Sequence, residues 1–247
     1  MKSLLCAARA AVMALGMLAG AANASVVIGG TRVVFPAQDG EVTLRLTNQG
    51  SRPALVEAWI DSGNPQSTPD KSDAPFLITP PLFRMEPHRD QSLRIIATQP
   101  HVPADRESLF WLNVLEVPPK PTGAEAAGKN LLQFAIRSRL KLFYRPAQLA
   151  GDPQKSAALL TWKALPANPG MAIEVHNPSP FYITLASVSL DVGGKHVSAD
   201  TGMVAPFGTL KLAISQLTRA PAAGTALSYS VINDYGAANT YKGSIAP

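Results

Sequence analysis

The sequence predicts an all-β protein with two β-sandwich domains. Short runs rich in apolar and β-branched residues recur along the chain, and clusters of Gly, Pro, Asn and Asp separate them. The 22 prolines among 247 residues disfavour long helices, and no amphipathic pattern of three helical turns stands out. The length that follows the first 24 residues suits two immunoglobulin-like sandwiches of about 100 residues each.

The first 24 residues have the pattern of a secretory signal peptide. Lys2 and Arg9 give a positive start, residues 10–22 are apolar, and Ala22-Asn23-Ala24 is a small-x-small cleavage site. The apolar run is too short to span a bilayer comfortably, which disfavours a membrane anchor. We therefore expect an exported mature chain that begins at Ser25, without stable membrane insertion.

Charge and cysteine content exclude several classes of function. The net charge of +5 falls to +3 without Lys2 and Arg9, and no dense Lys/Arg tract with interleaved aromatic residues occurs, so no nucleic-acid partner is expected. The only cysteine, Cys6, lies in the expected signal peptide. The mature chain is therefore expected to fold without a disulfide and to have no thiol chemistry.

The pattern of runs and turns divides the mature chain into residues 25–146 and residues 147–247. The turn-forming sequence Gly151-Asp152-Pro153 follows the boundary. The clearest expected strands are residues 41–47, 55–60, 91–97, 108–115 and 131–144 in the first domain, and residues 159–163, 172–176, 182–190, 210–214 and 227–232 in the second.

No catalytic, cofactor-binding or metal-binding motif is recognisable. The four histidines form no close metal motif, and neither a nucleophile elbow nor a phosphate-binding glycine loop is present. We therefore expect a protein that is not an enzyme and needs no cofactor. A secreted sandwich that binds another ligand, such as a carbohydrate or an adhesion partner, is the main alternative. Trp59, Trp111 and Trp162 lie in strand-like runs and are expected in the core, which disfavours an exposed aromatic platform.

Seven segments form an ordered set of motifs over almost the entire mature chain. They are TRVVFPA at 31–37, ITPPLFRMEP at 78–87, DRESLFWLNV at 105–114, RLKLFYRP at 139–146, HNPSPFY at 176–182, VAPFG at 204–208 and INDYG at 232–236. This set resembles the periplasmic chaperones of chaperone–usher pilus assembly. The resemblance implies two immunoglobulin-like domains set at an angle, with a cleft between them.

The resemblance also implies a function and partners. Such chaperones bind, fold and cap pilus subunits in the periplasm by lending a β-strand, a form of β-augmentation called donor-strand complementation. They then deliver the subunits to an outer-membrane usher. The loop over residues 118–130 is short, which resembles the short-loop class of the family. An exposed donor edge also makes a self-capping dimer of the free protein plausible.

The resemblance assigns two groups of charged residues. Arg32 and Lys141 match the cations that hold the carboxylate at the C-terminus of the subunit, a task that suits a guanidinium and an ammonium group. Glu107, Arg145 and Asp234 match an ionic network between the domains. From the sequence alone, these could equally be solvated surface charges.

The residues Leu132, Phe134 and Ile136 are expected to be the donor side chains. They alternate along one face of the run at 131–144, as a strand that fills an apolar groove requires. Alternation alone favours a strand that faces its own core, and only the resemblance reverses this preference. Lys141 has the opposite parity and is expected on the other face, unless a bulge, a strong twist or the end of the strand intervenes.

Overall fold

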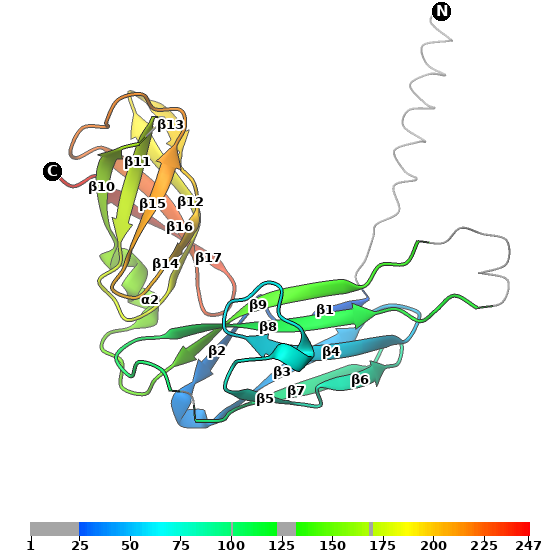
Figure 1. Ribbon diagram of the computed structural model, residues 1–247. Helices are drawn as coiled ribbons and strands as arrows, with labels where there is room; N and C mark the ends of the chain where they lie inside the picture. Colours follow the sequence, from blue (N-terminus) through cyan, green and yellow to red (C-terminus); the bar gives the residue numbers. More distant parts are fainter. Residues whose placement is uncertain (1–24, 100, 123–131, 168–169) are drawn as a thin grey trace, which may run out of the picture.

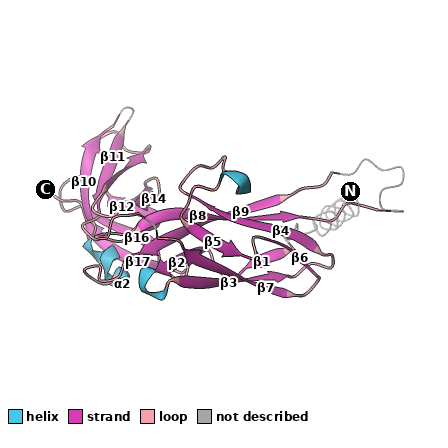
Figure 2. Cartoon of the chain, turned by 60° about the horizontal axis from the view of Figure 1, so that its bottom comes forward, coloured by secondary structure: helices cyan, strands magenta, loops and turns pink. Residues whose placement is uncertain are grey.

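The computed structural model describes residues 25–247, except for residues 100, 123–131 and 168–169. The expected signal peptide and much of the loop at 118–130 therefore lie outside the described residues. Strands dominate the described part, and the helical turns between them are short (Figure 2). No helix in that part is long and apolar enough to cross a membrane.

Two sheets form the N-terminal sandwich. One has the order β1-β3-β7-β5 and the other the order β2-β9-β8-β4-β6. The first sheet consists of β1 (Val26–Ile28), β3 (Glu41–Asn48), β7 (Asp90–Ala97) and β5 (Phe76–Thr79). The second consists of β2 (Arg32–Pro36), β9 (Ile136–Arg145), β8 (Ser108–Val117), β4 (Ala54–Asp61) and β6 (Leu82–Met85). All pairs are antiparallel except β2 and β9, which are parallel.

Alternate residues of these strands fill one core between the two sheets. Leu46 of β3 and Leu93 of β7 are fully buried, and they belong to the same cluster as Phe35, Leu112 and Leu142 of the other sheet. Each such side chain contributes about 1.5–3 kcal/mol when it leaves water, which explains why the alternation fixes which face turns inwards.

The start of the described chain is fastened to the far end of this sandwich. The Val26 amide donates to Glu116 Oε2 at 3.1 Å, and the Ser25 hydroxyl donates to the other oxygen of the same carboxylate. Glu116 lies opposite Ile136 in the register of β8 and β9. Ser25 and Val26 therefore lie close to the beginning of β9.

A second sandwich follows the short helix α2 (Pro153–Ser156). Asp152 caps this helix, because its Oδ1 accepts a hydrogen bond from the Gln154 amide at 2.9 Å. One sheet has the order β10-β11-β15, and the other has β13-β12-β16-β17 with β14 also paired to β12. The strands are β10 (Thr161–Pro166), β11 (Met171–His176), β12 (Ile183–Val192), β13 (Lys195–Ser198), β14 (Gly202–Val204), β15 (Thr209–Ile214), β16 (Ala226–Ile232) and β17 (Ala238–Ser244).

The second domain has its own core and stands at an angle to the first (Figure 1). Trp162 and Tyr229 are buried there, with ring centroids 4.9 Å apart. The two domains meet where β2 and β9 end, and Phe143 of β9 lies 5.7 Å from the ring of Tyr182. The predicted all-β class with two immunoglobulin-like sandwiches is confirmed.

The expectation for the three tryptophans was only partly correct. Trp162 is in the core of the second domain. Trp59 is buried, but it belongs to neither core cluster, because its position in β4 alternates with the core residues Ala58 and Ile60. Trp111 is only half-buried on the same outward face of the sheet, so the core expectation is wrong for it. An arginine side chain stacks on each of these two indoles, at 4.7 Å for Trp59 and 4.2 Å for Trp111.

Candidate functional site

The first half of β9 has a strand neighbour on one side only. β8 pairs with residues 136–144, whereas β2 pairs only with residues 141–145. Among the described residues, no strand covers the other edge of residues 136–140. Such an edge presents unpaired N–H and C=O groups, which can accept a strand from another chain.

An exposed apolar row lies at the start of this edge. Leu132, Phe134 and Ile136 expose 79%, 67% and 43% of their surface and belong to no core cluster. The same alternate positions continue inwards to Leu140 and Leu142, which are buried. Therefore one row of side chains fills the core of the domain at one end and projects beyond it at the other.

The strand itself is shorter than the sequence suggested. β9 begins at Ile136, and residues 132–135 precede it without regular structure. The expected strand over residues 131–144 was therefore too long at its beginning, and residue 131 lies outside the described residues. In the part of the chain that the structure describes, residues 132–135 pair with no strand.

Arg32 and Lys141 lie side by side at the point where β2 begins to cover β9. They are register partners in the parallel pair, so both side chains lie on the outward face of the sheet. Arg32 Nη1 donates to the Ile232 carbonyl of the second domain at 3.0 Å, and its buried Nε has no partner. Within the described residues, the Lys141 ammonium group has no hydrogen bond or ion pair.

Both cations of this pair are electrostatically unfavourable in the free protein. Burial lowers the pKa of Arg32, and the nearby charge of Asp234 offsets only part of that effect. Burial, followed by repulsion from Arg32, lowers the pKa of Lys141. An anion placed between them would reverse these effects, because it favours the charged form of each group.

In the structure, Lys141 lies on the opposite face of β9 from the apolar row, as the sequence predicted for a regular strand. The pairing of β9 with β8 runs from Ile136 to Tyr144 without a register shift. No bulge therefore brings Lys141 onto the face of the apolar row. Instead, Lys141 points to the outward face, and most of the apolar row lies before the strand starts.

The structure brings Glu107, Arg145 and Asp234 together at the domain junction. Arg145 Nε donates to Glu107 Oε1 at 2.7 Å, and its two Nη atoms donate to Asp234 at 2.8 and 3.0 Å. Glu107 Oε2 also accepts the backbone amide of Tyr182 at 2.7 Å. The three side chains thus join two segments of the first domain to two segments of the second.

Burial and pairing act in opposite directions on this network. Burial raises the pKa of Glu107, although the charge of Arg145 opposes the change. Burial also disfavours the charge of Arg145, but its bonds to Asp234 and Glu107 raise its pKa. Arg145 therefore stays charged, and the removal of one partner would leave a buried group unpaired.

A tight turn after β16 places Asp234 in this network. Asn233 Oδ1 accepts hydrogen bonds from the amides of Tyr235 and Ala237, both at 3.0 Å. Gly236 closes the turn with a positive φ of 85°. A Cβ atom there would lie 2.6 Å from Thr31 Oγ1 of the first domain, so the close approach of the domains requires glycine.

A second charged cluster on β9 was not predicted from the sequence. Arg137 and Arg139 share the outward face with Lys141 and bond to Asn113 and Asp61. The alternation of the three cations gave a weak signal of a shared face. Nothing in the sequence indicated that strands β4 and β8 would supply the partners.

Comparison with known proteins decides the family. Residues 25–150 match the family model described as "Pili and flagellar-assembly chaperone, PapD N-terminal domain", and residues 155–243 match "Pili assembly chaperone PapD, C-terminal domain". The chain belongs to the pilus-assembly chaperone family.

Individual relatives of this chaperone agree with that result. It is 45% identical over 236 residues to chaperone protein FimB/FhaD of Bordetella pertussis, which covers 94% of this chain and 93% of the relative. The crystal structure of the Pseudomonas aeruginosa CupB2 chaperone is 41% identical with a TM-score of 0.74, covering 89% of this chain and all of that one. The SafB chaperone of Salmonella enterica, solved in complex with the SafA pilin, is 33% identical with a TM-score of 0.73 and covers 92% and 99%.

Proposed function

We propose that this pilus-assembly chaperone binds and caps pilus subunits by donor-strand complementation. The free edge of β9, with the exposed row Leu132, Phe134 and Ile136 beside it, is the observation that supports this function most strongly. A subunit sandwich that lacks a strand exposes an apolar groove and two backbone edges. A donor strand fills the groove and pairs both edges.

The parallel pairing of β2 and β9 suggests how the guest strand would run. A guest strand on the free edge of residues 136–140 would lie in line with β2 and just before it. If this strand runs in the direction of β2, its last residue arrives beside Arg32 and Lys141. The carboxylate at the C-terminus of the subunit would then meet two cations that, among the described residues, have no carboxylate in hydrogen-bond contact.

The expected binding energies fit different roles for the apolar row and for the two cations. Each donor side chain that becomes fully buried in the groove would contribute about 1.5–3 kcal/mol. The charge pair would add affinity and, above all, fix where the guest strand stops. The apolar row supplies binding energy, and the cations set the alignment.

The remaining expectations concern the cellular setting and are part of the proposal. The chain is exported to the periplasm after removal of residues 1–24, and it delivers its subunits to an outer-membrane usher. SafB, a relative solved with a pilin, supports pilus subunits as the partner class. In the absence of a subunit, a second copy of the chain would cap the same edge.

The network of Glu107, Arg145 and Asp234 is proposed to hold the two domains in a fixed relation. Its ion pairs span the junction at 2.7–3.0 Å. Arg145→Ala should widen the range of interdomain angles, which small-angle X-ray scattering would detect as a larger radius of gyration. An unchanged scattering profile of the folded variant would remove this role.

Phe134→Ala is the sharpest test of the donor assignment. It removes a large side chain that is exposed in the free protein, so the melting temperature should stay close to that of the wild type. Recovery of pilus subunits from the periplasm of the native host should fall strongly. Ile136→Asp should reduce recovery further, because a charge would enter an apolar groove.

Leu77→Ala serves as the matched control, because Leu77 is an exposed apolar residue on β5 of the other sheet. It should affect neither melting nor subunit recovery. Strong destabilisation of the free Phe134→Ala protein, with normal capture by the folded remainder, would refute the donor assignment.

A further inference from the structure

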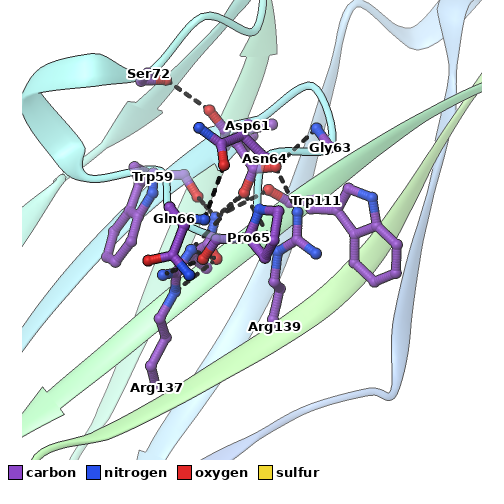
Figure 3. Close-up of polar contacts among 12 residues, drawn as sticks. Trp59, Asp61, Gly63, Asn64, Pro65, Gln66, Ser72, Trp111, Arg137 and Arg139 are labelled. Carbon is purple, nitrogen blue, oxygen red and sulfur yellow. Dashed lines mark hydrogen bonds and ion pairs between the residues drawn. The ribbon is translucent and has the colours of Figure 1, made fainter.

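The outward face of the sheet carries a closed polar network at the base of the donor segment (Figure 3). Arg137 Nε and Nη2 donate to Asn113 Oδ1 at 2.9 and 2.6 Å, and Nη1 donates to the Pro65 carbonyl at 3.0 Å. Arg139 Nη2 donates to Asp61 Oδ1 at 2.5 Å. Both arginines therefore reach across β8, towards β4 and the loop that follows it.

Asp61 is the acceptor at the centre of this network. Its side chain is fully buried, and it accepts hydrogen bonds from Asn113 Nδ2 and the Gly63 amide, both at 2.8 Å. Burial alone would raise the pKa of Asp61, but its bonds to Arg139, Asn113 and Gly63 hold the pKa below the ordinary value. Asp61 thus stays ionised as the buried partner of a β9 arginine.

Two aromatic rings complete the contacts of the arginines. The Arg137 guanidinium lies 4.7 Å from the centre of the Trp59 ring, and that of Arg139 lies 4.2 Å from the centre of the Trp111 ring. Planar stacking of this kind is specific to arginine, and lysine would not reproduce both the fork of hydrogen bonds and the stack. The network can therefore distinguish Arg137 and Arg139 from the neighbouring Lys141.

The network lies at the part of β9 that has a strand neighbour on one side only. Residues 141–145 of β9 lie between two strands, but residues 136–140 have only β8 as a neighbour in the described chain. Arg137 and Arg139 lie within this one-sided stretch. Side-chain bonds to β4 and its loop therefore add a hold on the part of β9 that lacks a second strand.

The network also selects the register of β9. A slip of one residue would turn the arginines into the core. A slip of two residues would place either Lys141 or Arg137 opposite Asn113, where Arg139 now lies. In either case Lys141 would leave its position beside Arg32.

We propose that Asp61 and Asn113 are positioning residues that lock β9 in register through Arg137 and Arg139. The lock keeps the start of β9 rigid and holds the apolar row and Lys141 at fixed positions relative to β8 and to Arg32 of β2. This role rests on the proposed donor function, but the lock itself is a property of the free protein and can be measured without a subunit.

Amide hydrogen exchange on the free mature protein tests the lock directly. In Asp61→Asn, the β9 amides of residues 136–140 that bond to β8 should exchange at least about tenfold faster, equivalent to about 1.4 kcal/mol of local stability. Amides of β3 and β7 in the other sheet should change far less. Asp90→Asn is the control, because Asp90 pairs with Arg45 on exposed positions of that other sheet.

Arg137→Gln provides a second variant, because it leaves the bond between Asp61 and Arg139 intact and should fold. Its faster exchange should be confined to the start of β9. Equal acceleration over both sheets in these variants would show a purely global loss of stability and would overturn the lock. Unchanged exchange at residues 136–140 would overturn it as well.

A second readout links the lock to function. The pilus subunit that co-purifies with the wild-type chain should be captured at least about tenfold more weakly by folded Arg137→Gln. Locally faster exchange with full capture would overturn the positioning role, although a stabilising contact would remain. Failure of the wild-type chain to capture any subunit would instead refute the proposed function and leave the exchange result unaffected.

Discussion

Two pairs of cations, one on β9 and one shared by β9 and β2, differ in whether the protein supplies their counter-charge. Arg137 and Arg139 bond to Asn113 and to the buried carboxylate of Asp61. A few residues further on, Lys141 and Arg32 lie side by side without any carboxylate in hydrogen-bond contact in the described structure. The difference separates charges that the protein pairs internally from charges that have no carboxylate in hydrogen-bond contact among the described residues.

Removal of Arg139 should have the largest effect on the free protein. Arg139→Ala would remove the hydrogen-bonded ionic partner of the buried Asp61 and leave only the 3.9 Å ion pair with Arg137. This change should lower the free energy of unfolding by about 3–5 kcal/mol. Urea denaturation measures this change. Arg45→Ala is the control, because Arg45 and Asp90 form an exposed pair worth about 0–1 kcal/mol. A similar small loss of stability in Arg139→Ala and Arg45→Ala would show that the buried ion pair matters no more than the exposed one.

Removal of Arg32 or Lys141 should weaken subunit binding rather than unfold the free protein. Arg32→Ala or Lys141→Ala should cost about 2–5 kcal/mol of subunit affinity if the charge pair is buried in the complex. The melting temperature of the free protein should hardly change in Lys141→Ala, whereas Arg32→Ala should lower it slightly, because it also loses the bond to the Ile232 carbonyl. Titration calorimetry with a captured subunit measures the affinity, and the exposed Lys163→Ala serves as the control. Wild-type affinity in both folded variants would contradict the anchor.

The smallest expected effect is a gain in stability of the free protein, and it is expected for Lys141→Met. Because burial and Arg32 lower the pKa of Lys141, its charge costs stability at neutral pH. Lys141→Met should therefore stabilise the free protein by about 0.5 kcal/mol or more at neutral pH, while it weakens capture. The wild type should recover this difference as the pH rises towards the ordinary lysine pKa of about 10.4, since the ammonium group then loses its charge. A destabilised Lys141→Met protein at neutral pH would contradict this account.

The sequence was most informative about features that short, contiguous segments contain. The motifs drew attention to Arg32, Lys141, Glu107, Arg145 and Asp234. The structure places Arg32 beside Lys141 and joins the other three at the domain junction. The local alternation of apolar residues also predicted strands such as residues 41–47, which lie in β3. These features depend on residues close together in the chain, so a single sequence displays them.

The sequence was least informative where side chains from distant strands meet. The contact between Arg139 and Asp61 joins residues 78 positions apart, and no local pattern announces it. The true start of β9 was also missed, because the apolar alternation begins before Ile136, the first paired residue of the strand. Periodicity reports which residues could share a face, but pairing decides where a strand begins.

The contact between Ser25 and Glu116 has a practical consequence for recombinant work. Ser25, Glu116, Phe134 and Ile136 line one surface depression, so anything fused before Ser25 emerges beside the exposed row. A purification tag at that end would compete with a guest for space and could mimic a loss of capture. Affinity handles belong after Pro247, at the far end of the second domain (Figure 1).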